Sequence, residues 1–122
     1  MTKILLVEDD PLLIDIYSTK FREAGFQVVA VDRGDIALGL IEKEMPDLVA
    51  LDIVLPQKDG WAILKSIKSS PKTKDIKVVI LSNLGQKEEI EKGMELGASG
   101  YLIKAHHTPS EVVKEIRKIL LQ

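Results

Sequence analysis

The chain has 122 residues, the length of a single compact domain, and it contains no cysteine. The absence of cysteine excludes disulfides, thiolate zinc sites, iron–sulfur clusters and cysteine nucleophiles. With 45% hydrophobic residues, 30% charged residues and a net charge of −2, the composition predicts a packed core and no bulk attraction to nucleic acid or to an anionic membrane. Neither a signal peptide nor a membrane-spanning run is apparent, so we expect one cytoplasmic domain over residues 1–122.

Five short apolar runs predict five β-strands. Four of them lack the polar alternation of a strand with one wet face, which is typical of parallel strands buried on both faces. The fifth run, over 100–103, is a weaker strand signal because small residues and a lysine enclose it. The runs are Ile4–Val7, Val28–Val31, Leu48–Leu51, Val78–Leu81 and Gly100–Ile103.

The segments between these runs have helical periodicity. Asp10 is the expected N-cap of the first helix, with Pro11 as its first residue and Gly25 at its end. Residues 108–111 form a capping box before the last helix. The predicted buried faces of the first, second, third and last helices are Leu13, Tyr17, Phe21 and Ala24; Ile36, Ala37, Leu40 and Ile41; Trp61, Leu64 and Ile67; and Val112, Val113, Ile116, Ile119 and Leu120.

The helix predicted over 87–96 is the weakest of the five. It carries Gly93 in its interior, and only Ile90 and Met94 are clear apolar anchors. Strands that alternate with single helices require right-handed crossovers between parallel strands. We therefore predict a doubly wound (βα)5 fold of the α/β class, with helices on both faces of the sheet.

Polar residues follow the predicted strands at their carboxyl ends, where open α/β sheets bind ligands. Glu8 and Asp9 follow the first strand, Asp52 the third, Ser82 the fourth and Lys104 the fifth. If the first and third strands are neighbours, the carboxylates converge, and two of them about 4 Å apart repel by about 4 kcal/mol at an effective dielectric constant of about 20. A hard divalent cation such as Mg²⁺, which prefers oxygen ligands, would offset this repulsion.

The same set of residues suits phosphoryl transfer. Asp52 is the candidate nucleophile that attacks phosphorus in line and becomes an acyl phosphate. Lys104 is expected to contact one phosphoryl oxygen and Ser82 to donate a hydrogen bond to another, while Mg²⁺ neutralises the developing charge. A simpler interpretation, in which each acidic residue only ends a strand or caps a helix as Asp10 does, explains single positions but not the coincidence at four strand ends.

Several segments, in this order and at this spacing, resemble the receiver domain of bacterial two-component response regulators. They are Leu6–Pro11, Pro46–Pro56 with Asp59–Gly60, Val79–Ser82 and Gly97–Lys104. The resemblance covers nearly the whole chain and implies a flavodoxin-like sheet with strand order 2-1-3-4-5. It also implies a phosphorylation-dependent switch, which is not a turnover enzyme and takes its phosphoryl group from a phosphohistidine on a sensor kinase or a phosphotransfer protein.

The resemblance also implies a role for individual residues. These are Asp52 as phosphoacceptor, Glu8 and Asp9 as the acidic pair that holds Mg²⁺, Val54 as a metal ligand through its main-chain carbonyl, Ser82 as the site hydroxyl, Tyr101 as the switch aromatic, and Lys104 as the phosphate-contacting lysine. Phosphorylation is then expected to draw Ser82 toward the phosphoryl group, so that Tyr101 turns inward. This changes the face of the fourth helix, fifth strand and fifth helix, where a downstream protein binds.

Three positions depart from the family pattern. Asn83 follows the site hydroxyl where a small residue is usual, so it is expected to crowd or hydrogen-bond the site. Ala105 follows Lys104 where a cis proline is common, so this peptide bond is either trans or strained. The apolar side chain of Val54 offers no group to orient a hydrolytic water, which predicts a long-lived phosphoryl group.

The first helix carries more apolar residues than one buried face needs. In the family this surface receives the phosphodonor, so Pro11, Leu12 and Ile14 are predicted partner contacts, with a wider buried face as the alternative. His106 and His107 lack further convergent ligands, which argues against a metal site there. No basic helix suits a DNA groove, so we expect no direct nucleic-acid partner and no membrane partner.

Other functions are weighed against the switch. The departures at Asn83 and Ala105 leave open a degenerate receiver that acts as a phosphorylation-independent protein-interaction module. A Mg²⁺-dependent phosphatase with an aspartate nucleophile generally needs a second acid where Val54 stands, and an FMN-binding flavodoxin needs a hydroxyl- and glycine-rich first loop, which is acidic here. The sequence leaves open whether the domain stands alone or belongs to a longer regulator.

Overall fold

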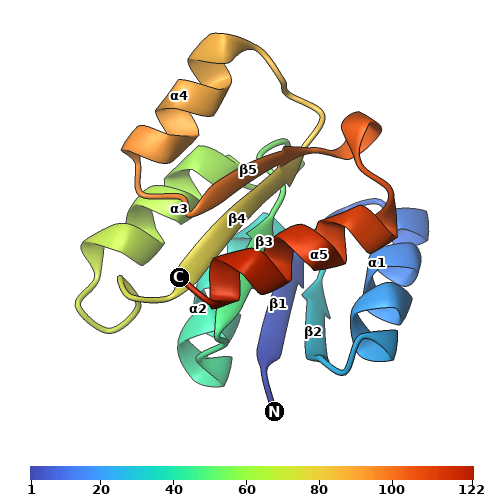
Figure 1. Ribbon diagram of the computed structural model, residues 1–122. Coiled ribbons are helices and arrows are strands. Elements are labelled where there is room, and N and C mark those ends of the chain that lie inside the picture. The colour runs from blue at the N-terminus through green and yellow to red at the C-terminus, as the bar shows by residue number, and fades with distance from the viewer.

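Five parallel strands form one sheet in the order β2-β1-β3-β4-β5 in the computed structural model, which describes residues 1–122 (Figure 1). The elements in chain order are β1 (Lys3–Val7), α1 (Pro11–Glu23), β2 (Gln27–Val31), α2 (Gly34–Glu44), β3 (Leu48–Leu51), α3 (Gly60–Ser69), β4 (Lys77–Ser82), α4 (Lys87–Glu95), β5 (Gly100–Ile103), the 3-10 turn η1 (Lys104–His106) and α5 (Pro109–Leu120). The predicted doubly wound α/β fold and its strand order 2-1-3-4-5 are confirmed.

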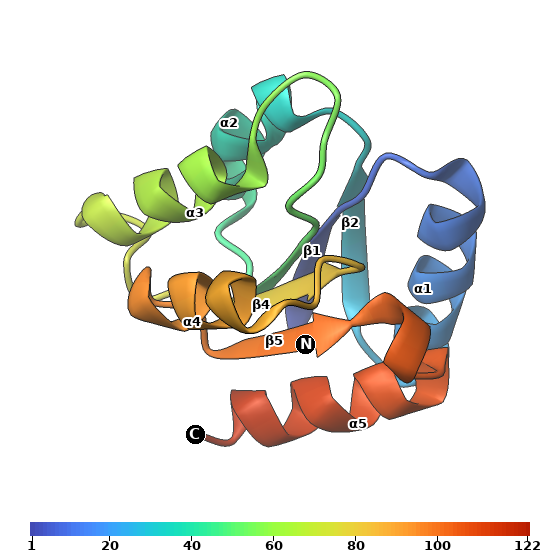
Figure 2. The ribbon, with the colours of Figure 1, turned by 90° about the horizontal axis from the view of Figure 1, so that it is seen from above.

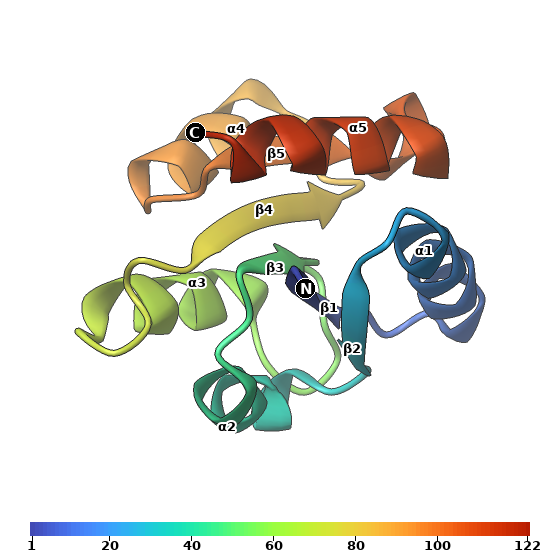
Figure 3. The same ribbon diagram turned by 60° about the horizontal axis from the view of Figure 1, so that its bottom comes forward.

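Helices cover both faces of this sheet (Figures 2 and 3). The helices α1 and α5 pack on one face, and α2 and α3 pack on the other, next to α4. Successive residues of β1 point to opposite faces, so Leu6 packs under α1 and α5 while Leu5 packs under α2 and α3. Both faces are therefore buried, which explains why the central strands show no polar alternation.

The burial predicted for β2 is wrong. Val28 and Val29 are only half-buried, Ala30 is exposed, and Val31 alone is buried. The reason is position, because β2 lies at the edge of the sheet and pairs only with β1. An apolar run by itself does not distinguish an edge strand from a central one.

Two apolar residues predicted to anchor helices are instead exposed, namely Ile36 in α2 (51%) and Met94 in α4 (46%). The helix α4 reaches the sheet through Gly93, which is buried. A Cβ atom at this position would lie 2.6 Å from Cδ1 of Ile80 and 3.1 Å from Cδ2 of Tyr101. Gly93 makes the helix harder to predict from the sequence, but it is also the residue at which α4 comes closest to the sheet.

The helix starts agree with the sequence prediction. The side chain of Asp10 accepts a hydrogen bond from the N–H of Leu12 at 2.9 Å, and Thr108 and Glu111 form the predicted capping box. These caps fix where α1 and α5 begin, at the same end of the sheet as the polar strand ends (Figure 1). None of the helices combines the length and apolar character required to cross a lipid bilayer.

Candidate functional site

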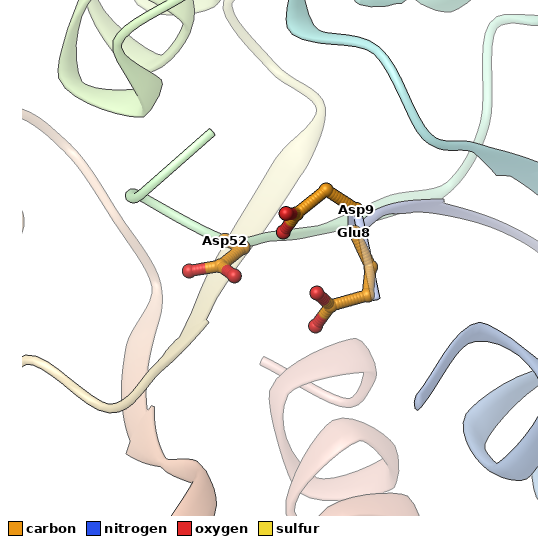
Figure 4. Close-up of side chains that lie close together, drawn as sticks. All are labelled: Glu8, Asp9 and Asp52. Atoms are coloured by element: carbon orange, nitrogen blue, oxygen red, sulfur yellow. The ribbon is translucent and has the colours of Figure 1, made fainter. Parts of the chain in front are cut away.

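The first and third strands bring three carboxylates together at the carboxyl end of the sheet. The pairing of β1 with β3 extends to Val7 and Leu51, so the residues that follow each strand lie side by side. These residues are Glu8 and Asp52, and the N–H of Asp52 donates to the carbonyl of Val7 at 3.0 Å. Carboxylate oxygens of Glu8, Asp9 and Asp52 lie within 4.8 Å of one another and surround a shared space (Figure 4). The structure therefore places these three residues as the sequence predicts.

Lys104 joins two of these carboxylates. Its Nζ donates to Oδ2 of Asp52 at 2.8 Å and lies 2.5 Å from Oε1 of Glu8. Burial lowers the pKa of Lys104, but the hydrogen bonds with Asp52 and Glu8 outweigh it and raise the pKa above its ordinary value. The ammonium group therefore stays charged, next to the side chain of Asp52, which is only 8% exposed.

Glu8 is the most deeply buried of the three carboxylates, with 1% of its surface exposed. Its Oε2 accepts a hydrogen bond from the N–H of Asp10 at 3.1 Å, and its Oε1 lies 2.5 Å from the ammonium of Lys104. Burial raises the pKa of Glu8, although Lys104 and the N–H of Asp10 oppose the rise. Lys104 and one main-chain N–H therefore compensate only part of the cost of burying this carboxylate.

The charges in this cluster do not balance. Three carboxylates face one ammonium, which leaves the cluster with a net charge of −2. Hard divalent cations take carboxylate oxygens, and three carboxylates converge here with a single ammonium among them. The residues present therefore fit a Mg²⁺ ion, in an open hollow of about 410 Å³.

Ser82 and Tyr101 meet at a residue that the sequence did not single out. Ser82 ends β4, is buried, and accepts a hydrogen bond through Oγ from the N–H of Leu84 at 3.3 Å. The hydroxyl of Tyr101 donates to the carbonyl of the same Leu84 at 2.5 Å. Burial raises the pKa of Tyr101 to about 12, so this hydroxyl remains a donor at neutral pH. Leu84 was missed because it lies in a loop without a motif of its own.

The loop after β3 folds back tightly onto Asp52. The N–H of Val54 donates to Oδ1 of Asp52 at 3.3 Å, and the N–H of Gly60 donates to the carbonyl of Ile53 at 2.9 Å. A Cβ atom on Gly60 would lie 2.5 Å from the carbonyl oxygen of Asp52, so only glycine allows this approach. The side chain of Val54 lies at the rim of the hollow and is 60% exposed. The metal-ligand role of its carbonyl stays a prediction.

Two of the positions that depart from the family pattern contact each other. The chain contains no cis peptide bond, so the bond between Lys104 and Ala105 is trans. The N–H of Ala105 donates to Oδ1 of Asn83 at 3.1 Å. Lys104 reaches Asp52 in this arrangement without a cis bond after it.

The predicted partner contacts lie at the start of α1, beside the acidic cluster. Pro11 is exposed, Leu12 is 66% exposed, and Ile14 is half-buried. Ile16, one turn after Leu12, is also exposed. The excess of apolar residues in α1 therefore lies largely on its surface, and the role of this surface in docking stays a prediction.

Comparisons with known proteins agree with this geometry. Residues 4–117 match the family model of the response regulator receiver domain. The probable transcriptional regulator ycf27 of Guillardia theta is 36% identical over 118 residues, which are 97% of this chain and 45% of the relative. The phosphate regulon transcriptional regulatory protein PhoB of Escherichia coli is 33% identical over 118 residues, which are 97% of this chain and 51% of that protein. The chain spans about half the length of the curated relatives it matches.

Solved structures superpose closely on the chain. The BeF3-activated N-terminal receiver domain of RstA from Klebsiella pneumoniae has a TM-score of 0.89 at 33% identity, and the match covers 99% of this chain and 100% of the other. A putative response regulator from Chloroflexus aurantiacus has a TM-score of 0.91 at 31% identity, with 99% and 98% covered. The chain therefore belongs to the family of response regulator receiver domains of two-component systems.

Proposed function

We propose that this domain accepts a phosphoryl group on Asp52 from a phosphohistidine of a sensor kinase or phosphotransfer protein, with Mg²⁺ bound, and thereby changes a partner-binding face. The observation that carries the proposal is the convergence of three carboxylates and one ammonium from separate strand ends, with two negative charges left over. Membership of a family of signalling domains supports a switch over a turnover enzyme.

Glu8, Asp9 and Asp52 would hold the metal, together with the predicted carbonyl of Val54. When bound, Mg²⁺ supplies positive charge that neutralises the oxygens of the transferring phosphoryl group. The protein prepares this site by burying Glu8 and by fixing its carboxylate with the N–H of Asp10. Asp9 is exposed and contributes a carboxylate from the solvent side of the cluster.

The transfer itself requires an in-line displacement at phosphorus. A carboxylate oxygen of Asp52 forms a bond to phosphorus while the bond from phosphorus to the donor imidazole nitrogen breaks, and the electron pair stays on that nitrogen. The ammonium of Lys104 already contacts Asp52, so it lies where it can bind a negatively charged oxygen of the transferred phosphoryl group. Ser82 uses its hydroxyl only as an acceptor, so its O–H proton is available to a second phosphoryl oxygen.

The switch is proposed to run through Leu84. If the hydroxyl of Ser82 turns toward the phosphoryl group, the N–H of Leu84 loses its acceptor and the loop between β4 and α4 is released from β4. Tyr101, which is bonded to the carbonyl of Leu84, then responds together with α4. Because the ring of Tyr101 lies against Gly93, a movement of this ring would act directly on α4.

The alternative, a degenerate receiver that acts as a protein-interaction module, predicts that Asp52 is not phosphorylated. It drew its support from Asn83 and Ala105, but these two residues contact each other, and Lys104 still reaches Asp52. We also expect a long-lived phosphoryl group, because the side chain at the rim of the hollow is that of Val54, which cannot orient water. Decay of the phosphorylated protein within seconds would contradict that expectation.

The test is labelling with a small phosphodonor. The protein is incubated with acetyl phosphate and Mg²⁺, and its intact mass is measured for the gain of one HPO3 unit. We expect one unit per chain, none after chelation of Mg²⁺, and none in Asp52→Asn. The matched control is Asp15→Asn, an exposed aspartate of α1, which should be labelled like the wild type. Absence of labelling in the wild type would refute the proposal.

A further inference from the structure

Asn83 contacts the turn that carries Lys104. The pairing of β4 with β5 ends at Ser82 and Ile103, so Asn83 is the first residue beyond the sheet on one side. Its side chain continues the connection between the two strands, because Oδ1 accepts from the N–H of Ala105 at 3.1 Å. Only the oxygen of an amide accepts from an N–H, so this contact also fixes the orientation of the Asn83 amide group.

The turn that bears Lys104 has weak internal support. It is a 3-10 turn of three residues, and the hydrogen bond from the N–H of His107 to the carbonyl of Lys104 is 3.5 Å long. A hydrogen bond of that length contributes little. The hydrogen bond that Asn83 accepts from Ala105 is shorter, and it joins the turn directly to the end of β4. It is therefore a main constraint on where the turn lies relative to the acidic cluster.

The position of this turn matters because the ammonium of Lys104 must reach two carboxylates at once. It contacts Oδ2 of Asp52 at 2.8 Å and Oε1 of Glu8 at 2.5 Å, so the main chain of Lys104 must lie where its side chain can reach both oxygens. Ala105 has the N–H that Asn83 needs, whereas a proline at this position would have none. Asn83 thus supplies the acceptor and Ala105 the donor of one hydrogen bond.

We propose that Asn83 is a positioning residue for Lys104, which acts by accepting the N–H of Ala105 and thereby aims the ammonium at Asp52. The inference rests on the proposed function for the role of Lys104 in phosphorylation. It is opposed to the simpler interpretation in which Asn83 only narrows access to the hollow that it lines. The two interpretations predict opposite effects of shortening the side chain.

The test compares Asn83→Ala, Asn83→Asp and Ala105→Pro, alone and as the double variant Asn83→Ala with Ala105→Pro. The first readout is amide hydrogen exchange at Ala105. We expect exchange about tenfold faster in Asn83→Ala, from the loss of one net hydrogen bond, and wild-type protection in Asn83→Asp, which keeps an acceptor oxygen. Exchange at core amides of β3 should stay unchanged, which separates this local effect from global unfolding.

The second readout is the rate of labelling by acetyl phosphate at saturating Mg²⁺. We expect Asn83→Ala to lower this rate about tenfold while Mg²⁺ affinity, followed by amide chemical shifts at the cluster, stays the same. Asn83→Ala should have no further effect once Ala105→Pro has removed the donor. Unchanged exchange at Ala105, or labelling of Asn83→Ala at or above the wild-type rate, would overturn the inference and favour the access interpretation.

Failure of the proposed function is distinguishable from failure of this inference. If the wild type is not labelled at all, the proposed function falls. Exchange at Ala105 and the NMR signal of the Lys104 ammonium, compared between wild type and Asn83→Ala, still decide whether Asn83 aims the lysine. A shifted ammonium signal with faster exchange supports the inference, and two unchanged signals refute it.

Discussion

Glu8 combines near-complete burial with a negative charge that the protein only partly compensates. Burial raises the pKa of Glu8, so the folded chain binds this proton more readily than the unfolded chain. Ionised Glu8 therefore lowers the free energy of unfolding at pH values above its folded pKa, and this cost disappears below the ordinary glutamate pKa of 4.5.

We predict that Glu8→Gln raises the urea midpoint at pH 7 without Mg²⁺, because it removes the buried charge. The gain should shrink as the pH is lowered toward 4.5, the ordinary pKa of the group. Added Mg²⁺ should stabilise the wild type more than the variant, because the variant has lost a carboxylate of the cluster. Glu42→Gln, at an exposed position of α2, is the control and should not change the midpoint. A lower midpoint for Glu8→Gln at pH 7 would contradict the argument.

Gly60 keeps the main chain of the phosphoacceptor in place. In Gly60→Ala the new methyl group would lie 2.5 Å from both the carbonyl oxygen of Asp52 and Cα of Ile53, and main-chain atoms cannot move aside cheaply. We predict a loss of about 2 kcal/mol in the free energy of unfolding, measured in urea, together with slower labelling at Asp52. Gly39→Ala is the matched control, because its Cβ meets nothing within 4 Å, and it should stabilise α2 by about 1 kcal/mol. Equal stability of the two variants would count against the proposed contact.

At the residue scale, the sequence identifies the charged part of the site because these residues directly follow strands. Pairing of neighbouring strands then determines where Glu8, Asp52 and Lys104 meet. The sequence does not identify Leu84 or the partner of Asn83, since both depend on how two loops fold over the strand ends. Contacts between loops follow no periodicity, so no pattern in the sequence predicts them.

At the scale of elements, α4 is held by few contacts. Its only buried residue is Gly93, and Lys92 places its ammonium 4.6 Å from the centre of the Trp61 ring in α3. Ile90 and Met94 predicted a helix of the right extent, but Met94 faces solvent. Periodicity could not locate the buried face because a glycine, which adds no apolar side chain, occupies the contact point.

We predict that Tyr101→Phe loosens α4 without affecting the chemistry at Asp52. The variant removes the hydrogen bond to the carbonyl of Leu84, so amide exchange in α4 should accelerate several-fold. The rate of labelling by acetyl phosphate should stay at the wild-type value, because Tyr101 does not contact the carboxylates. In the wild type, spectroscopic titration should show one tyrosine ionising near pH 12. Unchanged exchange in α4 would contradict the role given to this hydroxyl.

At the scale of the whole molecule, one sheet separates two independent layers of core packing. This arrangement was predictable, because apolar runs alternating with helical stripes admit few topologies other than a doubly wound sheet. The exposure of β2 was the exception, since its apolar run predicted a strand buried on both faces although the predicted strand order places it at the edge of the sheet. The helix α1 packs on the face shared with α5, and α2 and α3 cover the other face (Figure 2).

We predict that Leu12→Glu slows phosphotransfer from the cognate donor at least tenfold and leaves labelling by acetyl phosphate unchanged. Leu12 is 66% exposed and contributes no core packing, so the variant should fold normally. The matched control is Ile36→Glu, which places the same charge at another exposed apolar position, on α2. Equal slowing with both phosphodonors, or equal slowing in both variants, would contradict a docking role for this end of α1.

The double attachment of Leu84 determines what this loop position tolerates. The N–H of Leu84 donates to Ser82 at the end of β4, and its carbonyl accepts from Tyr101 in β5, so the main chain of one loop residue links the two strands. Both hydrogen bonds use main-chain atoms, so they can persist when another residue with an N–H replaces Leu84, whereas the packing of its half-buried side chain against the core would change. Proline is the one replacement that would remove the hydrogen bond to Ser82, because it alone has no main-chain N–H.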